Sequence, residues 1–522
     1  MADIVLTTFN AKYAHASMGL RCLFASLGDL QPRAVIAEAI CGDRPVELVE
    51  RLLAHDPKII GVGVYVWNAA ASRELVQLLK KVAPHVAVII GGPEVSHELE
   101  LQPIVQLADY VVTGEGEQAF LSLAKSILAG EKPSAKVHAG GMPNLTTLPL
   151  PYAHYDDEDV RHRVVYVEAS RGCPFTCEFC LSSLDERVRN IPLERLLPEL
   201  EKLMRRGVTQ FKFIDRTFNL KPAVSGAILQ FFLERYTPGL FVHFEMVPDR
   251  LPEALRSQLA KFPPGAVQLE VGVQTFNDEV AKRIGRRQDV PKLEDNFRYL
   301  AQHTGVHVHA DLIAGLPGES LESFAEGFDR LQALGPQEIQ VGILKRLRGA
   351  PIDRHTKDHG MVYAEEAPYE VLRTDVIDFS AMQRIKRFAK VWDVVGNSGQ
   401  FLESRKLLWQ DGSPFAAVMA LAERAHRELG RTHAVSLDRW FELVFAFLTE
   451  TKGIPAATAG NSLHLDYVRS GRKKLRWLAA FADSHEATAE RGRTDARAPH
   501  HAVTTEKVAG LPQRQARHLP VL

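Results

Sequence analysis

Two series of short apolar segments, each interrupted by helical patterns, constrain the fold of this chain most strongly. The first series lies within residues 3–130 and includes runs at 4–6, 59–66, 86–90 and 110–112. Apolar runs without polar alternation are typical of strands that are buried on both faces of a parallel sheet. The amphipathic spacing between them predicts helices that cover both faces. We therefore predict an α/β fold whose first domain, residues 1–130, is doubly wound and Rossmann-like.

The second series follows a segment rich in Pro, Gly, His and Asp, residues 131–163, which we interpret as a linker. Its strand candidates lie at 164–169, 210–215, 240–246, 267–273, 306–313 and 338–344. Six strand–helix repeats in this span predict a (β/α)6 partial TIM barrel over residues 164–350. The functional groups of both folds lie at the carboxyl ends of the strands.

The strand pattern fades after residue 350. Helical patterns at 369–395 and 414–429 predict a mainly α region over residues 351–483. Residues 484–522 contain few large apolar side chains, so we expect a disordered tail that adds nothing to a core.

Composition argues against several classes of partner. The formal net charge of −1 gives no electrostatic reason to expect a polyanion, so nucleic acid is not an expected partner. No apolar run approaches the length of about 20 residues that a membrane-spanning helix needs. The first eight residues carry no basic side chain and enter a strand-like run, which does not fit a signal peptide. We therefore expect a cytoplasmic chain with no membrane association.

Three of the five cysteines form one cluster, Cys173, Cys177 and Cys180, directly after the strand candidate at 164–169. Three thiolates on one loop can hold three irons of a cubane and leave the fourth iron open to another ligand. A structural zinc site needs four ligands, and a histidine could complete one here, so zinc stays an alternative. We interpret Cys22 and Cys41 as buried structural thiols.

The C-x3-C-x2-C loop, with an aromatic residue before its third cysteine, resembles that of the radical S-adenosylmethionine (SAM) superfamily. The segments 211–219, 269–275 and 311–319 resemble later strands of the same barrel. The resemblance implies a [4Fe-4S] cluster that cleaves SAM to a 5′-deoxyadenosyl radical, with an electron donor such as flavodoxin or ferredoxin as partner. The residues that it implies for SAM binding are Phe179, Asp215, Glu245, Gln274, Arg286 and Gly315.

Two segments of the first domain, 91–94 and 109–117, resemble the cobalamin-binding domain that precedes many radical SAM barrels. The residues that this resemblance implies for cobalamin binding are Tyr65, Gly91, Gly92, Glu94, Gly114 and Glu115. Many such domains ligate cobalt through an Asp-x-His-x-x-Gly loop. His15 lacks that aspartate and has a different glycine spacing, so we interpret it as a polar loop residue.

Segments 368–370 and 397–401 resemble an uncharacterised C-terminal domain found in some of these enzymes. Lys345 and Arg348, at the end of the barrel, either pair with an anionic substrate or form a solvated basic edge.

Together these resemblances imply a radical SAM enzyme that uses cobalamin to methylate an unactivated carbon of a small-molecule or unknown substrate. One alternative is radical SAM rearrangement or cyclisation without methyl transfer. Methylthiolation of transfer RNA fits less well, since its second cluster needs N-terminal cysteines and only Cys22 and Cys41 are available. The remaining alternative is a non-catalytic iron–sulfur or zinc module. The catalytic side chains and the substrate are not predicted.

Overall fold

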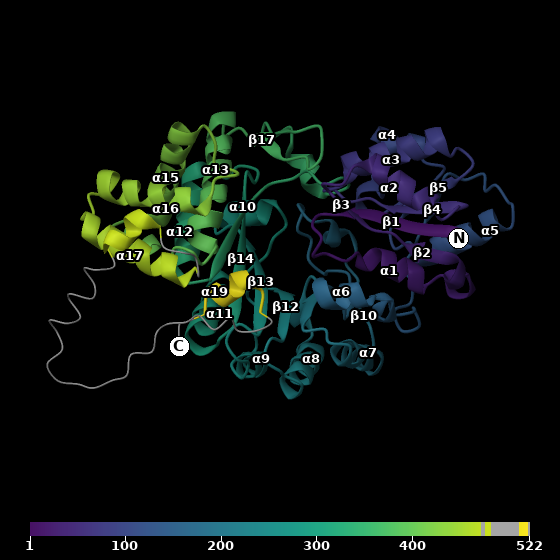
Figure 1. Cartoon of the computed structure of the whole chain (residues 1–522), viewed down its shortest axis with the longest axis horizontal. Coiled ribbons are helices and arrows are strands. Elements are labelled where there is room, and N and C mark those ends of the chain that lie inside the picture. The colour runs from purple at the N-terminus through teal and green to yellow at the C-terminus, as the bar shows by residue number, and fades with distance from the viewer. Residues whose placement is uncertain (471–474, 482–510, 520–522) are drawn as a thin grey trace.

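The computed structural model describes residues 1–470, 475–481 and 511–519 of the chain. Figure 1 shows three parts in a row, with the N-terminal domain at one end, the barrel in the centre and the C-terminal helices at the other end. Both α/β parts and the mainly α part match the predicted fold class.

The N-terminal domain is built on a parallel sheet with the strand order β2-β1-β4-β5-β6-β7. The main strands are β1 (Ile4–Asn10), β4 (Ile59–Gly63), β5 (Ala87–Gly91) and β6 (Tyr110–Thr113). The chain moves outward from β1 to β2 and then to β4 on the other side, which is the doubly wound order. Ligands of such sheets bind beyond the carboxyl ends of the strands, where this reversal opens a crevice.

Helices cover both faces of this sheet (Figure 1). One face is covered by α2 (Pro45–Leu53), α3 (Ala69–Val82) and α4 (Pro103–Leu107), and the other by α1 (Met18–Ala25) and α5 (Glu117–Leu128). The strands are buried because each face packs against an apolar helix stripe, as in the pair of Leu75 and Val88 on one face.

Three edge strands were not predicted: β2 (Ala34–Ile36), β3 (Ala39–Ile40) and β7 (Val137–Ala139). The segment expected as a linker, 131–163, therefore contributes β7 to the sheet, paired with β6, and the helix α6 (Asp157–His162). β7 is short and its residues are exposed or half-buried, so it lacks the apolar run by which the inner strands are recognised.

The central part is an open parallel sheet in sequential order, β8-β11-β12-β13-β14-β15. Its strands are β8 (Val165–Val167), β11 (Gln210–Phe213), β12 (Phe241–Met246), β13 (Val267–Gln274), β14 (His307–Ala314) and β15 (Glu338–Ile343). Each lies on one of the predicted strand segments. Six parallel strands in chain order form the predicted partial barrel.

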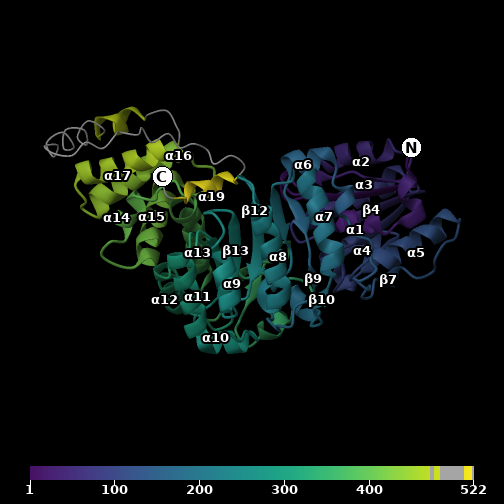
Figure 2. The same cartoon turned by 90° about the horizontal axis from the view of Figure 1, so that it is seen from below.

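Helices follow the barrel strands along their outer side (Figure 2). They are α7 (Leu193–Arg205), α8 (Pro222–Glu234), α9 (Glu253–Leu259), α10 (Asp278–Arg283), α11 (Val290–His303) and α12 (Leu321–Ala333). The apolar face of each strand packs against them. Phe213 of β11 and Phe232 of α8, for example, pack edge to face with their ring centroids 6.1 Å apart, and both are fully buried.

The C-terminal part consists mainly of helices. They are α13 (Phe379–Trp392), α14 (Ser404–Leu408), α15 (Pro414–Leu429), α16 (Leu437–Ala446) and α17 (Ala456–Arg469). The prediction of a helix at 414–429 is confirmed by α15. The prediction at 369–395 is wrong over its first ten residues, where β17 (Val371–Arg373) pairs with β16 (Val362–Tyr363) in a hairpin before α13 begins. A short apolar segment such as Val371-Leu372 fits both a strand and a helix.

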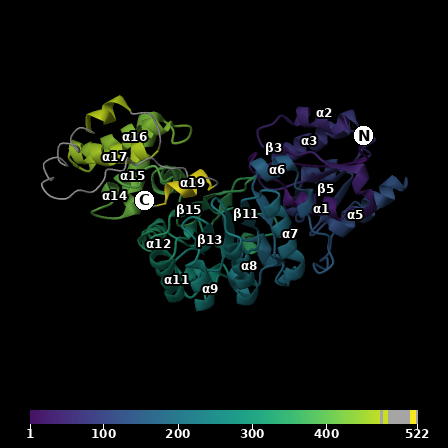
Figure 3. The same ribbon diagram turned by 60° about the horizontal axis from the view of Figure 1, so that its bottom comes forward.

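The prediction of a disordered tail is wrong for the described residues 511–519. They include α19 (Gln513–Arg517), which lies beside the barrel strands in both Figure 1 and Figure 3. The apolar residues Leu511 and Leu519 contact Gly265. The other residues of the predicted tail lie outside the described part of the chain.

Among residues 1–470, 475–481 and 511–519, the structure contains no helix of the length and apolar character that crossing a bilayer requires.

Candidate active site

The cysteine loop follows β8 and is shaped by contacts with neighbouring loops. Gly172 has φ +94°, and a Cβ on it would lie 2.3 Å from the carbonyl oxygen of Arg187, so only glycine fits this turn. The backbone N–H of Cys173 donates to the carbonyl oxygen of Asp185 at 2.8 Å. The N–H of Glu178 donates to the carbonyl oxygen of Ile284 at 3.0 Å. The loop is therefore fixed at both ends.

All three clustered cysteines line one cavity of about 240 Å³ at the carboxyl ends of the barrel strands. Four of the side chains expected to bind SAM line the same cavity: Phe179, Glu245, Gln274 and Arg286. Neighbouring residues that sequence analysis did not select are Arg216, Glu270 and Asp311. Asp311 begins the segment 311–319, from which the sequence analysis selected Gly315 and not Asp311.

The three thiols do not converge on one point. In the described chain, no group of three or more His, Cys, Asp or Glu side chains is arranged as the ligands of a single metal ion. A cubane does not require such convergence, because each thiolate binds a different iron. The donor set of three thiols in one cavity fits such a cluster.

Positive charge lies next to these thiols. The Nη1 of Arg286 is 3.6 Å from the Sγ of Cys177, and its other amino group donates to the carbonyl oxygen of Gly272. Arg216 forms a forked pair with Glu245, at 2.9 and 3.0 Å. Burial raises the pKa of the Cys173 thiol. Thiolates and their cluster are therefore stabilised by nearby cations in a site that would otherwise disfavour charge.

Gln274 is held in an unusual conformation at the end of β13. It has φ +71°, and the register with β14 shifts between Gly272 and Gln274. A Cβ on Gly272 would lie 2.3 Å from the Nε2 of Gln274, so glycine makes room for this amide. The Oε1 of Gln274 is buried without a hydrogen-bond partner. Strained backbone and an unpaired acceptor in a cavity are typical of a ligand-binding position.

The two other residues expected to bind SAM lie outside this cavity. The carboxylate of Asp215 accepts hydrogen bonds from the N–H of Ala169 at 2.9 Å and from the Oγ of Ser170 at 2.6 Å. It is buried behind the cysteine loop, and burial raises its pKa to about 7. Gly315 has φ +86° and faces Val371 and Met382. Asp215 thus supports the loop, and Gly315 supports the packing of the C-terminal part.

A second cavity, of about 450 Å³, lies at the carboxyl ends of the N-terminal strands and extends to the cysteine loop. Five of the residues expected to bind cobalamin line it: Tyr65, Gly91, Gly92, Gly114 and Glu115. Glycines shape its walls. Gly92 has φ +111°, and a Cβ on it would lie 2.5 Å from the carbonyl oxygen of Val64. A Cβ on Gly61 would lie 2.9 Å from the ring of Phe120, deeper in the cavity between β4 and α5.

Glu94 is not among the residues that line this cavity. Its carboxylate accepts hydrogen bonds from the hydroxyl of Tyr369 and from the Nε of Arg348, the latter at 3.1 Å. Arg348 also pairs with Glu98 at 3.0 Å. Arg348 is therefore neither a solvated edge nor open to a substrate, because it fastens the N-terminal domain to the end of the barrel.

Arg171 joins the second cavity to the cysteine loop. Its guanidinium lies 2.7 Å from both Glu115 and Glu117 and 2.8 Å from Glu168. The same side chain is mostly buried, and these carboxylates raise its pKa despite the opposing effect of burial. Glu117 retains one carboxylate oxygen that is buried without a partner. The two domains therefore share one buried charge network at the position where the cavities meet.

His15 lies at the barrel rather than in the second cavity. It forms a bridge with Val164, and its Nδ1 is 2.6 Å from the hydroxyl oxygen of Tyr166. Burial lowers the pKa of this imidazole. The interpretation of His15 as a loop residue with a structural contact agrees with this position.

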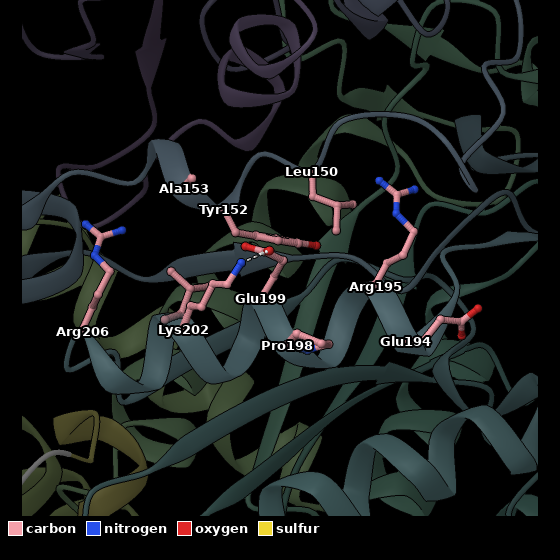
Figure 4. A pocket seen from close by; sticks show the side chains of 10 residues that line it. Leu150, Tyr152, Ala153, Glu194, Arg195, Pro198, Glu199, Lys202 and Arg206 are labelled. Carbon is pink, nitrogen blue, oxygen red and sulfur yellow. Dashed lines mark hydrogen bonds and ion pairs between the residues drawn. The ribbon is translucent and has the colours of Figure 1, made fainter.

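A third hollow, of about 630 Å³, lies along α7 and shares no lining residue with the other two (Figure 4). Its cations already have partners in the protein. Arg195 donates to the carbonyl oxygens of Leu145 and Leu148, and Lys202 pairs with Glu199 at 2.6 Å. The hollow therefore has no evident chemistry.

Comparison with known families divides the chain as the fold does. Residues 4–124 match the B12 binding domain model, residues 167–331 match the radical SAM superfamily model, and residues 357–519 match a model described as a protein of unknown function (DUF4080). The last match includes the docked residues 511–519.

Individual relatives agree with this division. The chain is 27% identical over 342 residues to the cobalamin-dependent radical SAM methyltransferase TokK of Streptomyces tokunonensis. It is 28% identical over 345 residues to 2-(S-pantetheinyl)-carbapenam-3-carboxylate methyltransferase of Streptantibioticus cattleyicolor. Each match covers 58% of this chain and 49% of the relative, so the chain spans about half the length of these curated relatives.

A solved structure shares the fold. The radical SAM methyltransferase TsrM from Kitasatospora setae, with cobalamin and a [4Fe-4S] cluster bound, matches 70% of this chain and 82% of its own length at 19% identity. The TM-score is 0.57. The cysteine cavity and the glycine-lined cavity agree with these matches: residues 167–331 form a domain of the radical SAM superfamily, and residues 4–124 form a B12 binding domain that precedes it.

Proposed function

We propose that this protein is a cobalamin-dependent radical SAM methyltransferase that methylates an unactivated carbon of a small molecule. One observation carries the proposal. Arg171 and Gly172 line the glycine-rich cavity of the N-terminal domain, and the next residue, Cys173, lines the cavity of the barrel. Two cofactors held in these cavities would therefore lie on either side of a single turn of the chain.

In the barrel, Cys173, Cys177 and Cys180 would hold the [4Fe-4S] cluster. Phe179, Glu245, Gln274 and Arg286 stay our proposal for SAM, and Asp311 joins them because it lines the same cavity. We leave out Asp215, because its side chain binds the backbone of Ala169, and Gly315, because it faces Val371 and Met382. The unpaired Oε1 of Gln274 offers an acceptor to an N–H or O–H group of the ligand.

In the N-terminal domain, Tyr65, Gly91, Gly92, Gly114 and Glu115 stay our proposal for cobalamin. Gly91 and Gly92 let the backbone approach the cofactor closely, and the unpaired oxygen of Glu117 can accept a hydrogen bond from an amide of the corrin ring. Glu94 is left out because Arg348 and Tyr369 already bind it.

When bound, the reduced cluster supplies the electron that cleaves SAM, and cobalamin supplies the methyl group. The protein residues orient both ligands and exclude water from the space between them. We propose flavodoxin or ferredoxin as electron donor and the cytoplasm as location, where cysteines stay reduced.

The proposal is tested with SAM that carries a trideuterated methyl group. Anaerobically reconstituted protein, supplied with cobalamin, reductant and a cell extract, should release 5′-deoxyadenosine and transfer the label to one product. Release of 5′-deoxyadenosine without label transfer would contradict methylation and favour a rearrangement or cyclisation. Absence of 5′-deoxyadenosine under all reducing conditions would contradict radical SAM activity itself and favour a non-catalytic module.

A further inference from the structure

The C-terminal segment 511–519 covers the amino ends of barrel strands, at the end opposite to the cysteine loop. Gln268, His307 and Glu338 lie at or next to the first residues of three strands there, and Gln268 is in register with His307 whereas Glu338 is in register with His309. The segment contacts each of them. Gln515 donates to Gln268 at 2.7 Å, Arg514 pairs with Glu338 at 2.7 Å, and the ring of His518 lies 5.1 Å from that of His307.

A series of polar side chains leads from this segment into the barrel. Along each strand, residues two apart lie on the same face, so His309 follows His307 and Asp311 follows His309. The Nδ1 of His309 is 3.7 Å from Glu338, and its Nε2 is 3.5 Å from Asp311. Asp311 lines the cavity of the cysteines. Arg514, Glu338, His309 and Asp311 therefore form a series of ion pairs from the tail to that cavity, in which the two contacts of His309 are longer than hydrogen bonds.

Arg514 supplies positive charge to this series from the tail, and it also pairs with Asp393 at 2.6 Å. Glu338 is 2% exposed, and its other oxygen accepts a hydrogen bond from His307 at 2.9 Å. Burial alone would raise the pKa of Glu338, but the hydrogen bond from His307 and the charge of Arg514 lower it. A buried carboxylate without such partners becomes protonated or turns away. The orientation of His309 would then be lost.

We propose that Arg514 is a positioning residue for the SAM site: through Glu338 and His309 it fixes the orientation of Asp311. The proposal rests on the proposed function, since it takes SAM as the ligand of the cysteine cavity. It assigns a role to residues 511–519, the end of the region that matches the domain of unknown function, which cover the amino ends of three barrel strands.

The test compares variants in the full-length reconstituted protein, with formation of 5′-deoxyadenosine and SAM binding as readouts. Arg514→Gln should raise the KM for SAM at least several-fold, while iron content stays at the wild-type level. Arg514→Lys, which retains the cation, should restore much of the affinity. Glu338→Gln should resemble Arg514→Gln, and the double variant should be no worse than either single one, because both interrupt the same series.

Gln515→Ala is the matched control. It removes a neighbouring docking contact of the same helix but leaves the charged series intact, so its KM for SAM should stay close to that of the wild type. Equal effects of Gln515→Ala and Arg514→Gln, or an unchanged KM in Arg514→Gln, would overturn the proposal. Failure of the wild-type protein to bind or cleave SAM would instead overturn the proposed function.

Discussion

The guanidinium of Arg171 lies 2.7 Å from the carboxylate of Glu115 and joins the cysteine loop to the N-terminal domain. Glu117 and Glu168 share this one cation, and all four side chains are mostly buried. Removal of one partner from a buried pair leaves uncompensated charge and costs about 3–5 kcal/mol. The network is therefore central to the placement of the two cavities.

Arg171→Gln should lower the free energy of unfolding by about 3 kcal/mol, because Glu117 and Glu168 would lose their shared cation and Glu115 would keep only Arg189. Thermal or urea unfolding checks this. Arg44→Gln is the control, since Arg44 is 75% exposed and its ion pair with Glu47 spans 3.4 Å. If the free energy of unfolding falls no further in Arg171→Gln than in the control, the network contributes nothing to the docking of the domains.

Gly92→Ala should abolish cobalamin uptake and leave iron content unchanged. The added methyl group would lie 2.5 Å from the carbonyl oxygen of Val64, so the loop that lines the cavity must move. The absorption spectrum of the reconstituted protein measures bound cobalamin, and iron analysis measures the iron content. Gly130→Ala is the control, because Gly130 has φ +85° with no atom within 4 Å of its added methyl. Normal uptake by Gly92→Ala would remove this loop from the proposed site.

His15→Ala should leave the absorption spectrum of bound cobalamin unchanged. The imidazole is engaged by Tyr166 at the barrel, so it is not placed beneath a cobalt ion. Loss of this hydrogen bond should cost about 1 kcal/mol of stability. A spectral change that reports the loss of an imidazole ligand would mean that His15 leaves Tyr166 when cobalamin binds.

Asp215→Asn should flatten the dependence of stability on pH. The pKa of Asp215 is raised by burial from 3.8 to about 7, so between these values the folded protein holds a proton that the unfolded chain has lost. Stability from this group is present below pH 3.8 and is lost as the pH rises through about 7. Urea unfolding at pH 5 and 7.5 should show a smaller decrease for the variant than for the wild type. Equal decreases would contradict the assignment.

Inner strands could be predicted from the sequence because their apolar runs report burial on both faces. All six barrel strands and four of the N-terminal strands appear in the predicted segments. Edge strands such as β7 could not, since an exposed strand needs no apolar run. The docked residues 511–519 were missed for a related reason. Their contacts include polar ones, as in the pair of Arg514 and Glu338, and a segment with few apolar residues is predicted from its composition to be a disordered tail.

Sequence analysis selected those residues of the candidate site that lie within local motifs. The cysteines and Gln274 lie within recognisable segments, whereas the fate of Glu94 depends on Arg348, which is 254 residues away. Asp215 and Asp311 both lie near the carboxyl ends of predicted strands and look equivalent in the sequence. Only the fold turns one toward the backbone of Ala169 and the other into the cysteine cavity.

Iron content and SAM cleavage of Cys177→Ala test the central claim most directly. Cys177 is buried in the cavity that we assign to the cluster. Cys41→Ala is the control, because the interpretation of Cys41 as a buried thiol is wrong: it is exposed and lies outside the loop, whereas Cys22 is buried. The account predicts four irons per chain and release of 5′-deoxyadenosine from the wild type and from Cys41→Ala, with both lost in Cys177→Ala. A Cys177→Ala protein that retains its iron and still cleaves SAM would contradict the account.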